Sequence, residues 1–222
     1  MPQLDKVAWG NAKRLLDRLG FGWLFESKQE IEKITLTDLN VILLKGSFDF
    51  GYALGLYSEP KNAHREKTPI GELLHRFKYQ FDQDAGAILA DLAAELINRQ
   101  NLLRTSNFIV TVPPSFTSRP FDPVSFLAER ISLGTGIRWE KGVIKRTRIT
   151  KLQKRILDKE AKKENVISTF RLNNPLPVSG KKILLLDDLY DSGVTTNHIG
   201  QILSQAGADK IFVMVLAKTR YV

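Results

Sequence analysis

The chain has 222 residues, 43% of them hydrophobic and 26% charged, which is enough to bury one sizeable core. It contains no cysteine and three histidines, so disulfides and thiolate metal sites are excluded and a histidine metal cluster is disfavoured. No apolar run approaches the roughly 18 to 20 residues that span a bilayer, and residues 1–20 carry charges where a signal peptide has an apolar stretch. We therefore expect a cytoplasmic protein without a membrane partner.

The net charge of +9 comes from one segment of the chain. Residues 141–182 contain 13 Lys and Arg and 3 Asp and Glu, a balance of +10, whereas the rest of the chain has 20 basic and 21 acidic residues. A basic segment of this kind either meets an anion or is a solvated face. Composition alone leaves both interpretations open.

The N-terminal part of the chain carries only weak signals. Residues 1–20 show a faint helical pattern of apolar positions, and residues 41–44 and 48–57 are strand-like. We expect a separate extension over residues 1–49, with a helix and a hood-like role, followed by the main domain over residues 50–222.

Two helices of the main domain open with the same signature. Thr68-Pro69 and Asp122-Pro123 each pair an N-cap residue with a proline in the first turn. Apolar residues at i, i+3, i+4 and i+7 follow both, and a further helix is expected over residues 84–99. The expected buried stripes are Ile70, Leu73, Leu74 and Phe77 in one helix and Val124, Leu127, Ala128 and Ile131 in the other.

Three short apolar runs predict buried strands of a parallel sheet. Residues 108–112 end at Pro113-Pro114, residues 183–186 are wholly apolar, and residues 211–217 follow a helix predicted over residues 195–206. Strand, tight turn, helix and strand within about 35 residues form a βαβ unit with a right-handed crossover. The predicted fold class is α/β, an open, mostly parallel sheet with helices on both sides.

The residues that carry chemistry lie in the stretch ILLLDDLYDSGVTT, residues 183–196. Ligands of open parallel sheets bind at the carboxyl ends of the strands, where Asp187 and Asp188 are expected. Adjacent carboxylates usually face cations or hydroxyl donors. Gly193 permits a tight turn into a helix, whose N-terminal amides suit a phosphate. A ligand with both a phosphate and vicinal hydroxyls, such as ribose 5-phosphate, fits this spacing.

This stretch resembles the 5-phosphoribosyl 1-pyrophosphate motif of type I phosphoribosyltransferases. The resemblance implies a type I phosphoribosyltransferase fold, a phosphoribosyl pyrophosphate (PRPP) ligand with Mg²⁺ as cofactor, and transfer of phosphoribose to or from a nitrogenous base. It implies that Asp187 and Asp188 act in catalysis, hold the ribose hydroxyls and contact Mg²⁺ directly or indirectly. It assigns the 5-phosphate to Asp191, Ser192, Gly193, Val194, Thr195 and Thr196.

Further stretches resemble the ComF-like branch of this family. The helix end LLHRFKY at residues 73–79 is similar to the branch's "ll..KY", and VPPS at residues 112–115 lies where its "VPvP" loop contacts pyrophosphate. Residues 146–170 are similar to its flexible basic hood, which closes over the leaving group, and the branch also implies a dimer. The residues that the resemblance places at the pyrophosphate or in the hood are Pro114, Ser115, Arg119, Arg146, Arg148, Lys151 and Lys154.

The chain departs from the ComF-like pattern in two places. Such proteins usually begin with a cysteine-rich zinc module, which this cysteine-free chain lacks, so its N-terminal part is a different element. Asp191 replaces the Thr that is more usual in the branch. In 6-oxopurine phosphoribosyltransferases, an Asp at this place helps to deprotonate or orient the purine N7. Asp191 is therefore a candidate catalytic base, and the alternative is a helix cap or a plain turn residue.

A second function also fits the resemblance, because ComF-like proteins are associated with DNA uptake and DNA metabolism. In this alternative the chain is a non-catalytic accessory protein that binds single-stranded DNA or a protein partner through its basic segment. Other readings are weaker. The DDLYD run matches the DDxxD pattern of isoprenoid synthases, which lies on helices, and a receiver domain has its paired acids near the N-terminus. No P-loop motif occurs, and the acceptor base is not legible.

Overall fold

The computed structural model describes residues 34–61, 64–114, 122–147, 170–173 and 178–220. The chain forms two compact units, Met1–Asp38 and Leu39–Val222. The boundary therefore lies earlier than the one expected after residue 49, which falls inside a strand of the main sheet. The N-terminal helix expected in the first 20 residues lies outside the described residues.

Little of the first unit is described. It contains the 3-10 turn η1 (Leu36–Asp38). The backbone N–H and the hydroxyl of Thr35 donate to the carboxylate of Asp38 at 2.8 and 2.6 Å, which closes the turn.

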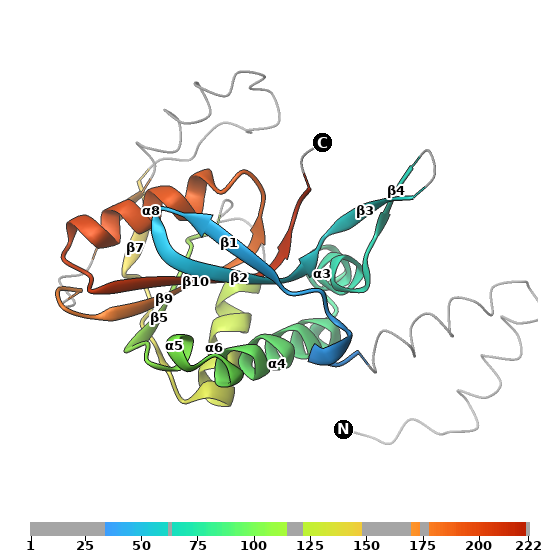
Figure 1. The fold of residues 1–222 in the computed structure, drawn as a ribbon, viewed down its shortest axis with the longest axis horizontal. Helices are drawn as coiled ribbons and strands as arrows, with labels where there is room; N and C mark the ends of the chain where they lie inside the picture. The colour runs from blue at the N-terminus through green and yellow to red at the C-terminus, as the bar shows by residue number, and fades with distance from the viewer. Residues whose placement is uncertain (1–33, 62–63, 115–121, 148–169, 174–177, 221–222) are drawn as a thin grey trace, which may run out of the picture. The chain divides into compact units, whose positions relative to one another are not determined.

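The second unit is built on a six-stranded sheet with the order β1-β2-β10-β9-β5-β6 (Figure 1). The strands are β1 (Ile42–Gly46), β2 (Phe48–Leu56), β5 (Phe108–Thr111), β6 (Arg138–Trp139), β9 (Lys182–Tyr190) and β10 (Lys210–Lys218). All neighbours run parallel except β1, which forms an antiparallel pair with β2. The expected open, mostly parallel sheet is confirmed.

Helices cover both faces of this sheet (Figure 1). The helices α3 (Pro69–Tyr79), α4 (Gln83–Arg99), α5 (Asn101–Arg104) and α6 (Pro123–Thr135) lie on one face. The helix α8 (Val194–Gln205) lies on the other face, together with a two-stranded ribbon of β7 (Ile144–Arg146) and β8 (Phe170–Leu172). A hairpin of β3 (Ser58–Lys61) and β4 (His64–Lys67) follows the end of β2. Within the part of the chain that the structure describes, no helix is long and apolar enough to cross a bilayer.

The two helices predicted from the cap-and-proline signature begin where expected. The hydroxyl of Thr68 accepts a hydrogen bond from the amide of Gly71 at 3.0 Å, which satisfies one free donor of the first turn of α3. The carboxylate of Asp122 does the same for Val124 at 3.1 Å in α6. All eight apolar residues of the two predicted stripes are buried.

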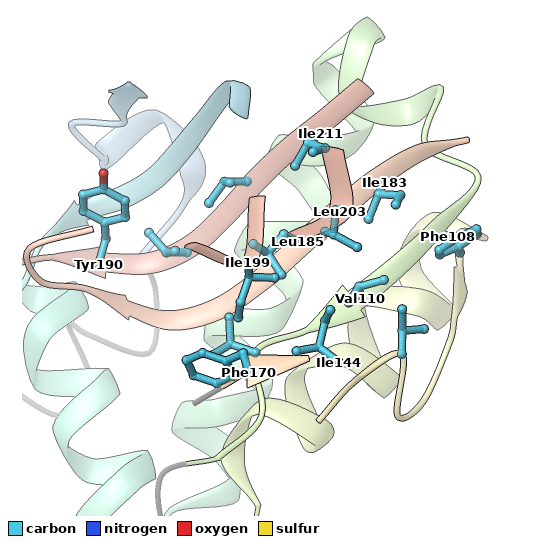
Figure 2. Close-up of a cluster of buried hydrophobic side chains, with 14 of the residues drawn as sticks. Phe108, Val110, Ile144, Phe170, Ile183, Leu185, Tyr190, Ile199, Leu203 and Ile211 are labelled. Atoms are coloured by element: carbon cyan, nitrogen blue, oxygen red, sulfur yellow. The ribbon is translucent and has the colours of Figure 1, made fainter. Parts of the chain in front are cut away.

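The side chains of β9 alternate between the two faces, as they do in any strand. Ile183 and Leu185 belong to the apolar cluster beneath α8, which Val110, Ile199 and other residues complete (Figure 2). Leu184, from the opposite set, is equally buried but lies outside that cluster. Each fully buried side chain of this kind contributes about 1.5–3 kcal/mol to folding, so the register of β9 is firmly fixed.

Candidate functional site

Strand β9 is longer than its sequence predicts. The expectation was a strand over residues 183–186, but the ladder with β10 continues to the pair Lys218↔Tyr190 and includes Val215↔Asp187. Asp187 and Asp188 therefore lie inside the last part of a strand rather than after it. The partner strand is the reason, because β10 itself extends to Lys218 and supplies the pairing that the polar residues of β9 need.

Because side chains alternate along β9, the two acids turn to different faces of the sheet. Asp188 faces α3, where its Oδ2 atom lies 2.7 Å from the Nζ atom of Lys78, and each of these side chains is 15% exposed. Helix α3 begins beside the end of β2, where the Thr68 hydroxyl donates to the carbonyl of Leu56. It packs against β2 and β10, and its last turn reaches Asp188 of β9. Burial on its own lowers the pKa of Lys78, but the charge and the hydrogen bond of Asp188 raise it above its ordinary value.

Asp187 continues the set of β9 side chains that faces α8 and the ribbon. Its Oδ1 atom accepts a hydrogen bond from the amide of Asp188 at 2.8 Å. Burial raises the pKa of Asp187 to about 8, and the negative charge of Asp188 adds to the rise, while Lys78 and Arg146 oppose it. Arg146 is the last residue of β7, and its guanidinium lies 4.6 Å from the centre of the Phe170 ring. Burial lowers the pKa of Arg146, and the charge of Asp187 opposes this.

The turn after β9 leads directly into α8. Gly193 has a φ of 74° and is the N-cap of the helix, a left-handed conformation that glycine adopts without strain. A Cβ atom at this position would overlap the Tyr190 hydroxyl, so glycine is also required for space. Since the N-cap has no side chain, no side-chain cap covers the first amides of α8.

Several hydrogen bonds hold the turn in place. The buried Thr196 hydroxyl donates to the carbonyl of Gly193 at 3.1 Å. The side-chain oxygen of Asn197 accepts from the amide of Ser47, at the turn between β1 and β2, at 2.6 Å. The carboxylate of Asp191 accepts from the Thr219 hydroxyl, just after β10, at 2.7 Å. Asp191 is not the N-cap residue of α8, so the helix-cap alternative is excluded. A plain turn residue and a catalytic base remain as its possible roles.

The expected pyrophosphate side is described only in part. The amide of Val112 donates to the carbonyl of Leu186 at 3.0 Å, so the chain leaves the sheet at Pro113 beside the acid pair, and Pro114 is exposed. Among the expected hood residues that the structure describes, Arg146 lies near enough for its charge to act on Asp187. The predicted Ser115, Arg119, Arg148, Lys151 and Lys154 lie outside the described residues.

Sequence reasoning assigned no role to three residues at this site. Lys78 contacts Asp188, Tyr190 packs against Gly193, and Thr219 donates to Asp191. The sequence did contain a signal for Lys78, because it is the Lys of the "KY" helix end that resembles the ComF-like branch. Tyr190 and Thr219 lie at the ends of apolar strands, and nothing in the local pattern distinguishes them from core or surface residues.

No family model matches the chain. It is 29% identical over 157 residues to the DNA utilization protein YhgH of Escherichia coli K12, a match that covers 68% of either chain. It is 25% identical over 189 residues to Competence protein F of Haemophilus influenzae, which covers 81% of this chain and 77% of that protein.

Two solved structures are among those similar to the chain. The first is a glutamine PRPP amidotransferase from B. subtilis, with a TM-score of 0.41 and 20% identity over 59% of this chain and 26% of that one. The second is an adenine phosphoribosyltransferase from Leishmania tarentolae, with a TM-score of 0.41 and 16% identity over 72% of this chain and 66% of that one. The curated relatives confirm the resemblance to ComF-like proteins that the motifs indicate, and the sheet is of the mostly parallel α/β kind that this resemblance implies.

Proposed function

We propose that the chain binds PRPP or a ribose 5-phosphate ligand at the carboxyl end of β9 and transfers phosphoribose to or from a nitrogenous base. One observation carries the proposal. The carboxylates of Asp187 and Asp188 and the Gly193 turn that opens α8 lie within ten residues of one another, on one edge of the sheet. Carboxylates accept hydrogen bonds from sugar hydroxyls, and amides at a helix N-terminus donate to a phosphate.

The charges around the acid pair suit an anionic ligand. Lys78 lies against Asp188, and Arg146 lies close enough to Asp187 for each to influence the pKa of the other. Two cations thus balance two carboxyl groups, so an incoming phosphate does not meet an uncompensated negative pair. A carboxyl group with a raised pKa also lessens this repulsion, because it is protonated near neutral pH.

Magnesium fits this site as part of the ligand. The described residues contain no group of three or more His, Asp or Glu that could hold a metal. Mg²⁺ commonly takes one or two carboxylates and completes its coordination with substrate phosphates and water. Asp187 and Asp188 would supply the protein contacts, either directly or through water. When bound, Mg²⁺ would neutralise charge on the pyrophosphate.

The transfer would break the bond between ribose C1 and pyrophosphate and form a bond from C1 to a nitrogen of the base. Negative charge builds up on the departing pyrophosphate. Arg146, half-buried and stacked on Phe170, is a fixed cation on this side of the acid pair. Asp191, held by Thr219, is the candidate to accept or orient a proton of the base.

Calorimetry tests the binding step. Ribose 5-phosphate and PRPP with Mg²⁺ should each give saturable heat with the wild-type chain at millimolar concentrations or below. Gly193→Ala should abolish it, because the new Cβ overlaps Tyr190 and the φ of 74° is strained for alanine. Gly136→Ala is the matched control, because Gly136 has the same φ of 74° with nothing within 4 Å of a Cβ, and it lies at the end of α6. No heat for either ligand with the wild-type chain contradicts the proposal.

Turnover is tested separately from binding. The chain is incubated with PRPP, Mg²⁺ and a panel of bases, and pyrophosphate release is followed. Asp188→Asn should abolish any release that belongs to this site. Release that persists in Asp188→Asn would mean that the acids are assigned to the wrong role.

A specific observation favours a second function. In the β7/β8 ribbon, Lys145 and Arg171 lie directly opposite each other and both are exposed. Like charges in this arrangement are destabilising, so an anion that binds across them would stabilise the ribbon. Relatives of the chain are named for DNA utilization and competence. We therefore keep single-stranded DNA, or a protein partner, as the alternative occupant of the basic segment.

A titration separates the two functions. Single-stranded DNA is added at two salt concentrations, with and without PRPP and Mg²⁺. A steep salt dependence that the small ligand leaves unchanged favours an independent nucleic-acid surface. Competition between PRPP and DNA would place the DNA contact at the acid pair. Absence of DNA binding at low salt would remove the DNA alternative.

A further inference from the structure

The ion pair between Lys78 and Asp188 joins two elements that are far apart in sequence. Lys78 lies in the last turn of α3, and Asp188 lies in β9. Their 2.7 Å contact is largely shielded from water, since each side chain is 15% exposed. It therefore differs from the ion pair between Lys67, the last residue of β4, and Glu72 of α3, which is 3.1 Å long with side chains 36% and 34% exposed.

This position gives Lys78 an effect on any divalent cation at the acid pair. Mg²⁺ binds carboxylate oxygens at about 2.1 Å, so an ion on the Oδ2 atom of Asp188 would lie within about 5 Å of the Lys78 ammonium. Two cations this close repel strongly in surroundings that exclude water. A metal ion that brings no phosphate therefore has to displace the ammonium from Asp188 before it can bind. A metal ion that arrives coordinated by phosphate oxygens does not have to displace the ammonium.

We propose that Lys78 is the resident counter-ion of the candidate site, which fixes the Asp188 carboxylate for sugar hydroxyls and keeps a free divalent cation away from it. The ligand role rests on the proposed function. The competition between Lys78 and a metal ion rests only on the ion pair. Lys78 is in this sense a positioning residue, because it acts through Asp188.

The competition is measured with Mn²⁺ alone, whose free concentration is read by electron paramagnetic resonance. The wild-type chain should bind Mn²⁺ weakly, and Lys78→Gln should bind it at least tenfold more tightly because Asp188 is released. Lys78→Arg keeps the positive charge and should behave like wild type. Adding Asp188→Asn to Lys78→Gln should return the affinity to the wild-type level. Lys67→Gln, which breaks the more exposed ion pair between β4 and Glu72 of α3, should have no effect.

The ligand role is measured by titrating ribose 5-phosphate in the absence of metal. Lys78→Gln should weaken binding at least tenfold and Lys67→Gln should leave it unchanged. If neither the wild-type chain nor any variant binds ribose 5-phosphate, the proposed function is wrong. The Mn²⁺ titration would still show whether Lys78 and a metal ion compete for Asp188. Equal Mn²⁺ affinity of wild type and Lys78→Gln overturns the proposal.

A second measurement covers the case in which Lys78→Gln does not fold. The ammonium of Lys78 is titrated by NMR in the wild-type chain and in Asp188→Asn. The proposal expects the amine to titrate at lower pH in Asp188→Asn, because burial then acts without the carboxylate. An unchanged titration would show that the two groups are not coupled and would overturn the proposal.

Discussion

Asp187 and Asp188 are neighbours in sequence, yet the sheet turns one toward α8 and the β7/β8 ribbon and the other toward α3. On the α3 side, Asp188 meets the ammonium of Lys78 at 2.7 Å. On the ribbon side, burial raises the pKa of Asp187 to about 8 and Arg146 opposes this only in part. The two aspartates thus lie in different electrostatic surroundings, because each face supplies different neighbours.

A pair of acids at a strand end is therefore not one uniform negative patch. The carboxylate paired with the ammonium is held in a fixed position, whereas burial favours the protonated form of its neighbour, which can then donate as well as accept a hydrogen bond. A ligand with several hydroxyls could use both kinds of group.

The largest effect on stability is expected when the fixed pair is broken. Asp188→Asn leaves the largely buried ammonium of Lys78 without its counter-charge, and this should lower the free energy of unfolding by about 2–4 kcal/mol, measured in urea. Glu72→Gln is the control, since it breaks the more exposed pair with Lys67 and should cost at most about 1 kcal/mol. Equal costs for the two variants would contradict the contrast in burial.

The second prediction concerns the pH dependence that Asp187 contributes. The folded protein keeps this proton up to a pH of about 8, whereas the unfolded chain releases it near the ordinary pKa of 3.8. The stability that the group contributes is therefore complete below pH 4 and is lost as the pH rises toward 8. The wild-type free energy of unfolding should therefore fall relative to that of Asp187→Asn as the pH rises over this range.

Urea unfolding of both proteins between pH 4 and pH 8 checks this prediction. At pH 8, Asp187→Asn should be at least as stable as wild type, since it replaces a group whose ionisation burial opposes. A difference between the two proteins that stays constant with pH would mean that Asp187 titrates as an ordinary carboxyl group.

The smallest effect is expected on the outer surface of the ribbon. Lys145→Gln removes one of two exposed like charges that face each other across β7 and β8, and it should raise the free energy of unfolding by about 0.2–0.5 kcal/mol at low salt. Added salt should reduce the gain because it screens the repulsion. Chemical denaturation at two salt concentrations measures this, with Lys181→Gln as a control elsewhere in the basic segment. A loss of stability would mean that Lys145 has a favourable partner.

The elements that could be predicted from the sequence are those whose signals are local. Thr68 and Asp122 cap their helices because an N-cap acts on amides two or three residues away. The residues that form the interaction are therefore all present in the local sequence pattern. The Gly193 turn was predicted for the same reason, since a left-handed N-cap calls for glycine at that position. The acid pair was found because it directly follows an apolar run of residues.

The features that could not be predicted depend on partners distant in sequence. The strand β9 continues to Tyr190 only because β10 pairs with it to Lys218. The ion pair of Lys78 with Asp188 forms because α3 packs against β2 and β10 and its last turn reaches β9, and no local periodicity encodes that path. The early unit boundary follows from β1, whose pairing with β2 places it in the main sheet.

The central claim is that the acid pair and the first turn of α8 hold one ribose 5-phosphate between them. Backbone amide NMR tests it most directly, with ribose 5-phosphate and ribose added separately to the wild-type chain. We expect ribose 5-phosphate to shift the amides of Gly193, Val194 and Thr195 together with that of Asp188, and to leave the amide of Gly136 unchanged, while ribose alone leaves the turn unchanged. If saturating ribose 5-phosphate leaves the amide resonances of the turn unshifted, the account is contradicted.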